Sequence, residues 1–378
     1  NAHHNYLYIV LLTEVTKMLF SLASILLLAP AIEGCSDFMM RFQEDSFKLS
    51  GRTMDLGATN NWTISTWPVG VETGYVSDDD SIPSSFRWTS KYNSIGISGN
   101  WLGDDKALLP SLFGDGLNDQ GLSCGMLTLI NSQYETYDES KNNVFFGTFC
   151  QYAVQMYATV AEAAASMDSI TIYGPAILEQ HFVLRDATGA SLVIEMINGE
   201  KSLYLDNNDG GETGYGIMTN EPELSYHLTN VDHYEWKRSL ARQAVAVPGG
   251  WYPEERFLRV HMVKAGMENS GDADTTDFQQ AFSLTSQVLN TVTVPMGFQY
   301  GTDTGEASGE GDNADHTMFG IVRDHKNPAI YWRDSRNPTF RRLRLEDIDF
   351  QSKQQQMLTL ETGNYFIDMS DKMVPLSL

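Results

Sequence analysis

Cys35 is the residue of this sequence best suited to covalent chemistry, because it lies just beyond an apolar run. The run covers residues 18–32 and is typical of the central part of a secretory signal, and Gly34 supplies a small residue where a signal peptidase would cut. Cleavage after Gly34 would make Cys35 the first residue of the mature chain, with a nucleophilic thiol and a free α-amine. Since that amine has a pKa of about 7.7 to 8, it can carry the proton that the thiol releases. This combination predicts an amidase.

Other interpretations of the leader differ in what they do to Cys35. The apolar run is shorter than the roughly 20 residues that span a bilayer, so a membrane helix is disfavoured. A lipoprotein signal would leave Cys35 acylated and its amine blocked, but Glu33 stands where such signals have small residues. We therefore predict a leader over residues 1–34 that is removed, a single domain over 35–378, and a secreted or periplasmic location. The segment 1–17 enters no fold prediction.

Composition limits the kinds of partner. The chain has 378 residues, 42% of them hydrophobic, and no Pro-rich or Ser-rich linker divides it, which is typical of one domain with a sizeable core. Its 49 Asp and Glu residues against 25 Lys and Arg give a net charge of −24. So acidic a surface disfavours nucleic acid and anionic membranes. We expect a small-molecule acyl amide as the partner, and leave open whether copies of the chain form a homo-oligomer.

The sequence favours neither a metal nor a cofactor. Asp303-Thr304-Gly305 resembles half of an aspartic protease site, but no second copy occurs, and the acidic stretch around it lacks EF-hand spacing. His227 and His233 are too far apart for a helical metal pair. Cys124 and Cys150 either form a disulfide or remain buried thiols.

The hydrophobic pattern predicts antiparallel strands packed against helices. Three strands are expected over 181–185, 191–197 and 201–205, joined by turn-like segments, and a later strand over 329–333. Apolar residues at helical spacing predict one helix over about 149–168, and further helices are expected near 253–268 and 277–290. This combination indicates a layered α+β fold.

Five short motifs in one order resemble the choloylglycine hydrolase family, which contains bile salt hydrolases and penicillin V acylases. The likeness extends from Cys35 to about residue 350. The motifs are Cys35, Gly51-Arg-Thr-Met-Asp55, Asp115-Gly-Leu-Asn-Asp-Gln-Gly-Leu122, Met218-Thr-Asn-Glu-Pro222 and Pro253-Glu-Glu-Arg-Phe-Leu-Arg259.

The resemblance implies an N-terminal nucleophile hydrolase with an αββα sandwich of two antiparallel sheets flanked by helices. It also implies a catalytic set. By motif, Cys35 is the nucleophile, Arg52 and Asp55 lie beside it, Asn220 is the amide that faces the oxyanion, and Arg256 is a cation near the thiol. Asp55 can hold the α-ammonium, while the two arginines favour the thiolate. Losing a donor such as Asn220 typically costs about 10²- to 10³-fold in rate.

Two departures from the family pattern affect the substrate and the assembly. Thr128 falls where bile salt hydrolases usually carry Asn and penicillin acylases often Tyr, so we expect a backbone N–H in the oxyanion hole, with Thr128 in the substrate site. The stretch 231–247 is shorter than the loop that helps Gram-positive members form tetramers, so a tetramer is not implied.

Each motif also has a purely structural interpretation. Arg52 and Asp55 could form a surface ion pair, Asn220 could belong to a turn, and Arg256 could lie on a solvated helix face. The ordered set favours catalysis over these interpretations. Trp62, Trp67 and Trp101 line an acyl pocket or fill the core.

We therefore predict a cysteine hydrolase of non-peptide C–N bonds in linear amides, acting through a thioester. Conjugated bile acids, penicillin V and N-acyl amides such as acyl homoserine lactones are the substrates that the resemblance implies. One alternative is an acid-ceramidase-like or N-acylethanolamine-type amidase that cleaves itself internally. Another is a non-catalytic surface lipoprotein that keeps the fold.

Overall fold

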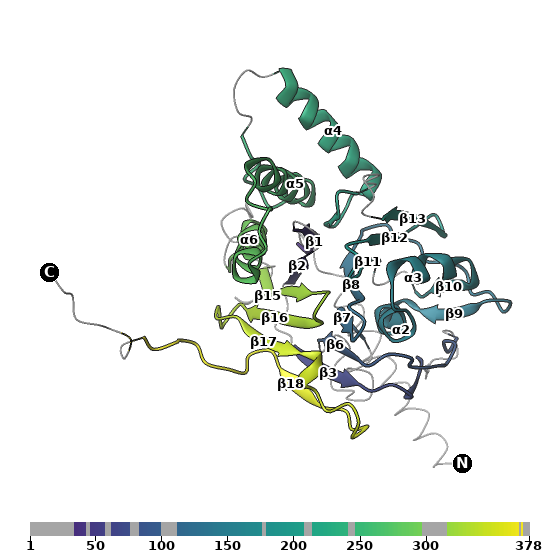
Figure 1. Ribbon diagram of the computed structural model, residues 1–378. Helices are drawn as coiled ribbons and strands as arrows, with labels where there is room; N and C mark the ends of the chain where they lie inside the picture. Colours follow the sequence, from purple (N-terminus) through teal and green to yellow (C-terminus); the bar gives the residue numbers. More distant parts are fainter. Residues whose placement is uncertain are drawn as a thin grey trace, which may run out of the picture.

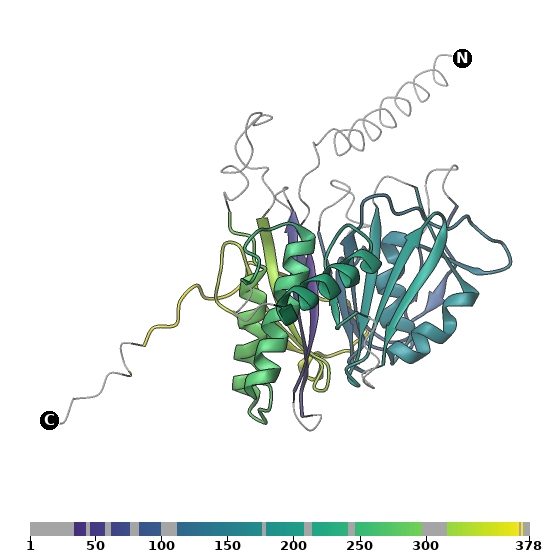
Figure 2. The ribbon, with the colours of Figure 1, turned by 90° about the horizontal axis from the view of Figure 1, so that it is seen from above.

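The computed structural model describes residues 34–42, 46–56, 62–75, 83–99, 112–175, 179–207, 214–240, 246–296, 316–369 and 372. Two large antiparallel sheets face each other, and helices cover their outer faces, as the two views in Figure 1 and Figure 2 show. The predicted α+β sandwich is thus confirmed. Residues 1–33 of the proposed leader, Trp101 and the acidic stretch 301–315 lie outside the described residues.

The first sheet carries the motif that includes Cys35. Its central strands come from both ends of the described chain, because β15 pairs with β2, which pairs with β1. Across this sheet the order is β14 (Ile217–Met218), β1 (Ser36–Arg41), β2 (Lys48–Leu56), β15 (His316–Asp324), β16 (Ala329–Asp334) and β17 (Arg341–Arg344).

The second sheet faces the first and contains the predicted meander. That meander forms β11, β12 and β13 in antiparallel register, so the three strand predictions are confirmed. Across this sheet the order is β13 (Glu200–Asp206), β12 (Ser191–Ile197), β11 (Gln180–Arg185), β8 (Ser123–Thr128), β7 (Asp115–Asn118), β6 (Ser94–Ser98), β3 (Thr63–Trp67) and β18 (Met357–Thr359). Short pairs are β4 (Glu72–Thr73) with β5 (Trp88–Thr89), and β9 (Asn142–Phe145) with the parallel β10 (Ile170–Tyr173).

Helices pack on the outer face of each sheet and bury their apolar sides there. Helices α5 (Pro253–Ser270) and α6 (Phe278–Thr291) lie on the first sheet, near the predicted bounds, and contact β1 and β2. Helices α2 (Phe149–Met156) and α3 (Val160–Ser166) lie on the second sheet and contact β7, β8 and β12. Since β1 has helices on one side and the second sheet on the other, its residues are almost all buried.

The single helix predicted over 149–168 is wrong in its middle. Tyr157 and Thr159 have extended backbone, so the chain forms α2 and α3 instead. Thr159 accepts the Glu162 N–H at 3.1 Å, and the Glu162 carboxylate accepts the Ala158 N–H at 2.8 Å. This is a capping arrangement that begins a new helix, and it overrides the continuous apolar stripe.

Helix α4 (Leu224–Leu240) was not predicted, and it extends from the body beside α5 (Figure 1). Its sequence has no continuous apolar stripe, so the hydrophobic pattern did not indicate a helix. In the structure, only Leu224, His227 and Val231 are buried along it. Elsewhere, Cys124 on β8 and Cys150 on α2 form a disulfide, which decides the question that the sequence left open. Within the described ranges, every helix is too short or too polar to cross a membrane.

Candidate active site

Cys35 immediately precedes β1 in the first sheet. Its side chain is 4% exposed and takes part in no disulfide among the described residues. Sγ lies 3.7 Å from Met54 Sδ and 3.9 Å from the carbonyl oxygen of Asp55. The register of β1 against β2 places Ser36 opposite Thr53, which brings the Gly51–Asp55 motif beside the cysteine.

Arg256, from the first turn of α5, ties the start of β1 to the segment after β14. Its Nη1 donates to the Cys35 carbonyl at 2.5 Å and to Ser36 Oγ at 2.7 Å, while Nη2 donates to Asn220 Oδ1 at 2.9 Å. The side chain is fully buried, so the interpretation of a solvated helix face is wrong. Burial lowers the pKa of Arg256, against the raising effect of the negative charges of Asp55 and Cys35.

Asn220 is fully buried and held at both ends of its amide. While Oδ1 accepts from Arg256, Nδ2 donates to the Thr128 carbonyl oxygen at 3.0 Å. The hydrogen bond from Arg256 identifies Oδ1 as the oxygen of the amide and Nδ2 as the nitrogen. Nδ2 carries two N–H groups, of which one donates to Thr128 and the second can donate to a substrate. Thr128 thus reaches the site through its backbone, and its hydroxyl accepts from Gln180 at 3.3 Å.

His227 supports Asn220 from α4. Its Nε2 lies 3.0 Å from the Asn220 carbonyl oxygen, which can only accept, so Nε2 must donate. The ring stacks on Phe257 with centroids 4.8 Å apart. Burial lowers the pKa of His227 to about 4, which keeps the ring neutral near neutral pH.

Asp55 is buried beside the residue that precedes the nucleophile. Its Oδ1 accepts from Thr317 at 2.5 Å, and its Oδ2 lies 3.4 Å from Thr53 Oγ1. A Cβ added to Gly34 would lie 2.7 Å from Oδ2, so Gly34 packs directly against the carboxylate. Burial raises the pKa of Asp55 to about 7, and the Arg256 charge only partly opposes this effect.

Arg52 lies one side chain away from the cysteine, and its charge is paired with other groups. Its Nη1 donates to Asp115 at 2.8 Å and Nη2 donates to the Met126 carbonyl, so the charge is paired between the sheets. The link to the cysteine runs through Met54, whose sulfur lies 4.0 Å from Arg52 Nη2. Because Arg52 and Asp55 are both buried and do not pair with each other, the interpretation as a surface pair is wrong.

Arg52 belongs to a buried ion network between the two sheets. Asp37 accepts from Arg185 at 2.5 Å and from Arg323 at 3.1 Å, while Asp115 accepts from Arg52 and from Arg323 Nε at 2.9 Å. Burial alone would raise the pKa of Asp37, but the charges of Arg185, Arg323 and Arg52 hold it below its ordinary value. The network joins β1 and β15 to β7 and β11, and so fixes the strand that carries Cys35.

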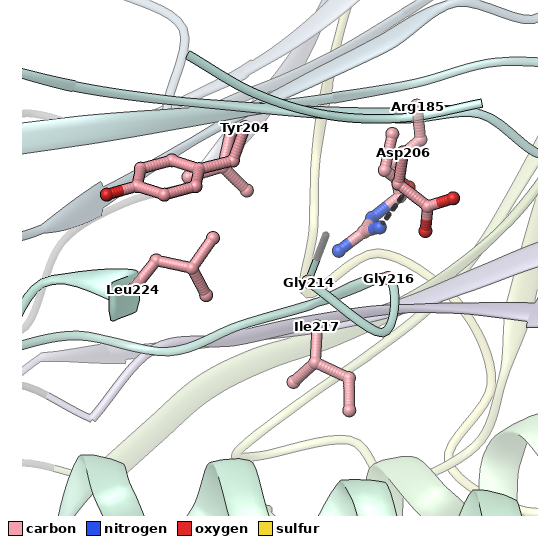
Figure 3. A pocket seen from close by; sticks show the side chains of 9 residues that line it. Arg185, Tyr204, Asp206, Gly214, Gly216, Ile217 and Leu224 are labelled. Atoms are coloured by element: carbon pink, nitrogen blue, oxygen red, sulfur yellow. Dashed lines mark hydrogen bonds between the residues drawn. The ribbon is translucent and has the colours of Figure 1, made fainter. Parts of the chain in front are cut away.

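Figure 3 shows a pocket beside Arg185, one member of this network. Arg185, Tyr204, Asp206, Gly216 and Leu224 are among the residues that line it, and Arg185 donates to Ser191 within it at 2.6 Å. Within the described residues, its lining includes none of the predicted site residues. The tryptophans that could have lined an acyl pocket, Trp62 and Trp67, are buried and pack on Phe319 and Phe113.

The sequence missed the residues that support the site. Ser36, Met54, His227 and Thr317 all contact a predicted site residue. Ser36 and Met54 lie inside or beside recognised motifs, so proximity could have suggested them. His227 and Thr317 carried no such signal, because their contacts depend on strand register and helix placement.

Comparison with known proteins accords with this geometry. Residues 35–358 match the family described as linear amide C–N hydrolases, choloylglycine hydrolase family, and the match begins at Cys35. The chain is 26% identical to a penicillin V acylase from Pectobacterium atrosepticum over 300 residues, which cover 74% of this chain and 73% of that protein.

Solved structures with the same fold include a penicillin V acylase and a conjugated bile acid hydrolase. Penicillin V acylase from Agrobacterium tumefaciens has a TM-score of 0.68 at 22% identity, covering 86% of this chain and 91% of that one. A variant of the conjugated bile acid hydrolase from Clostridium perfringens has a TM-score of 0.69 at 21% identity, covering 87% of this chain and 99% of that one. These neighbours confirm the fold, and the family match shows that the chain belongs to the choloylglycine hydrolase family of linear amide C–N hydrolases.

Proposed function

We propose that this amide hydrolase uses Cys35 as an N-terminal nucleophile and acts through a thioester. The observation that carries the proposal is the convergence of Cys35, Asp55, Asn220 and Arg256 in one buried cluster at the start of β1. In support, the family match also begins at Cys35.

In the proposed cycle a single group, the α-amine of Cys35, carries every proton that is transferred. The α-amine of Cys35 takes the thiol proton, the sulfur attacks the amide carbon, and the carbonyl oxygen becomes negative. The second N–H of Asn220 stabilises that oxygen. Collapse breaks the C–N bond, and the α-ammonium protonates the leaving amine. The amine then deprotonates a water molecule, which attacks the thioester and releases a carboxylic acid and the thiol.

The cycle requires that the bond between Gly34 and Cys35 be broken, so we also propose that residues 1–34 are removed. Gly34 packs against Asp55, and a carboxylate there can hold the new ammonium. A lipoprotein is disfavoured because Cys35 is buried with its sulfur against Met54, whereas a lipid-bearing cysteine must face the membrane.

We propose a secreted or periplasmic location. The disulfide between Cys124 and Cys150 supports it, because such bonds persist in oxidising compartments. For substrates we propose the acyl amides named in the relatives, penicillin V and conjugated bile acids, together with N-acyl homoserine lactones.

The test is hydrolysis of that panel by the wild-type protein and by Cys35→Ala and Cys35→Ser. We expect at least one amide to be cleaved, and Cys35→Ala to lose about 10³-fold or more in kcat with unchanged near-ultraviolet circular dichroism. A Cys35→Ala variant with the wild-type rate would rule out the nucleophile. Two fragments of the active protein on a denaturing gel would instead favour the amidase that cleaves itself internally.

A further inference from the structure

Strand β15 contains a bulge opposite Asp55. From Asp324 opposite Leu49 to Phe319 opposite Met54 the pairing is regular, and its continuation would put Met318 opposite Asp55. The register shifts there, and Thr317 is opposite Asp55 instead. The bulge therefore places a hydroxyl group where regular pairing would place a thioether, and bulges often re-aim side chains in this way beside active sites.

The hydroxyl of Thr317 has a fixed direction. Its Oγ1 lies 2.8 Å from the Val294 N–H and 2.5 Å from Asp55 Oδ1, and the Thr317 N–H donates back to the Val294 carbonyl at 3.0 Å. Because the Val294 N–H can only donate, Oγ1 must accept it, and its single proton is directed to Asp55. With Thr317 and Val294 each 6% exposed, water has little access to this chain of hydrogen bonds.

The two oxygens of Asp55 thus have different neighbours. Oδ1 is held by Thr317 at 2.5 Å, whereas Oδ2 faces Gly34, the residue joined to Cys35, and accepts a longer hydrogen bond from Thr53 at 3.4 Å. A carboxylate fixed through one oxygen cannot rotate freely, so the other keeps its direction. The donated hydrogen bond also favours the charged form of Asp55.

We propose that Thr317 is a positioning residue that fixes Oδ1 of Asp55 so that Oδ2 is directed to the α-amine of Cys35. This inference rests on the proposed function, because it assigns the free amine of Cys35 a part in catalysis. Thr317 acts through Asp55 and does not touch the substrate.

The first experiment compares Thr317→Val with Thr317→Ser in the mature enzyme. Two pH profiles are measured, kcat/KM and the rate of Cys35 alkylation by iodoacetamide. Valine keeps the shape but removes the hydroxyl, so the Asp55 pKa rises and the acid limb of both profiles moves up by about 0.5 to 1 pH unit. We expect kcat/KM near pH 7 to fall by about 10-fold or more, and serine to restore both profiles.

A double-mutant cycle separates positioning from a general structural effect. If Thr317 acts through Asp55, Thr317→Val lowers the alkylation rate in the wild-type background but changes it by less than about 2-fold in Asp55→Asn. Thr285→Val is the matched control, since it removes a buried hydroxyl that donates within α6 at 2.9 Å, and it should keep the wild-type profiles.

Wild-type profiles in Thr317→Val, or equal losses in both backgrounds of the cycle, would overturn the inference. Failure of the proposed function has a different signature, because Cys35→Ala would then remain active whatever Thr317 does. An inactive Cys35→Ala together with a normal Thr317→Val would reject the role of Thr317 alone.

Discussion

At the scale of single residues, the site depends on side chains that are each held by two or more partners. Arg256 contacts Cys35, Ser36 and Asn220 at once, so it sets the distance between the nucleophile and the amide. A planar guanidinium suits this task because its N–H groups form a rigid fork.

Asn220→Ala tests the proposed oxyanion donor. We expect kcat to fall by about 10²- to 10³-fold with a much smaller change in KM, because the donor acts mainly on the charge of the transition state. Steady-state kinetics on the best amide of the panel checks this. Asn327→Ala is the control, because its side-chain amide donates to Asp324 at 3.3 Å in an exposed turn. A change confined to KM would show that Asn220 binds the ground state instead.

Asp55→Asn tests the raised pKa of the Asp55 carboxyl group. The experiment uses the unprocessed chain, in which Gly34 is still joined to Cys35. The pKa of Asp55 is raised from 3.8 to about 7 by folding. Between these pH values the folded protein therefore binds one proton more than the unfolded chain does. The stability contributed by this proton is fully present below pH 3.8 and is lost as the pH rises through 7. We expect the unfolding free energy of wild type, relative to Asp55→Asn, to decline over that window in denaturant titrations. A difference that stays constant would contradict the raised pKa.

The sequence motifs predicted which residues form the site, but they did not predict all the contacts that these residues make. Cys35, Asp55, Asn220 and Arg256 come together as the motif order implies, since each motif ends or begins an element next to β1. Arg52 has its charge paired with Asp115, a partner on the facing sheet that no local pattern reveals. Thr317 could not be predicted, because a bulge decides which residue faces Asp55.

At the scale of elements, the two sheets are joined by buried charges as well as by apolar packing. Arg323 on β15 contacts Asp37 on β1 and Asp115 on β7, and all three side chains are almost completely buried. Asp37 and Asp115 keep Arg185 and Arg52 when Arg323 is removed, but each loses hydrogen bonds that offset the cost of a buried charge.

Arg323→Met should therefore lower the unfolding free energy by about 3 to 5 kcal/mol, measured by denaturant titration. Arg336→Met is the control, because Arg336 forms an exposed pair with Glu361 at 2.7 Å, and a surface pair contributes about 0 to 1 kcal/mol. Equal effects of the two substitutions would show that the interior network does not hold the sheets together.

Elements with a strong periodic pattern were predictable, and those defined by capping or tertiary contacts were not. Strands β11, β12 and β13 are apolar segments separated by turn-forming residues, so the local sequence was enough to predict them. The break between α2 and α3 depends on Thr159 and Glu162, a capping pair inside an otherwise continuous apolar stripe. Helix α4 has few buried positions and carries no such stripe.

At the scale of the whole molecule, the Cys124–Cys150 disulfide links the second sheet to its helices. Because the bond closes a separation of 26 residues, its reduction should lower the unfolding free energy by about 2 to 4 kcal/mol. We expect activity to persist in dithiothreitol at low temperature, since the site lies on the first sheet. A stability that does not respond to reduction would show that these thiols are not joined in the working protein.

The central claim is that catalysis begins with the thiol and the free amine of Cys35. The most direct measurement is intact mass and N-terminal sequencing of the active protein, before and during turnover stopped by acid. We predict a chain that begins at Cys35 and, in the stopped sample, a mass increase equal to the acyl group on the N-terminal peptide. An active chain that begins elsewhere, or whose N-terminal amine is blocked, would contradict the account.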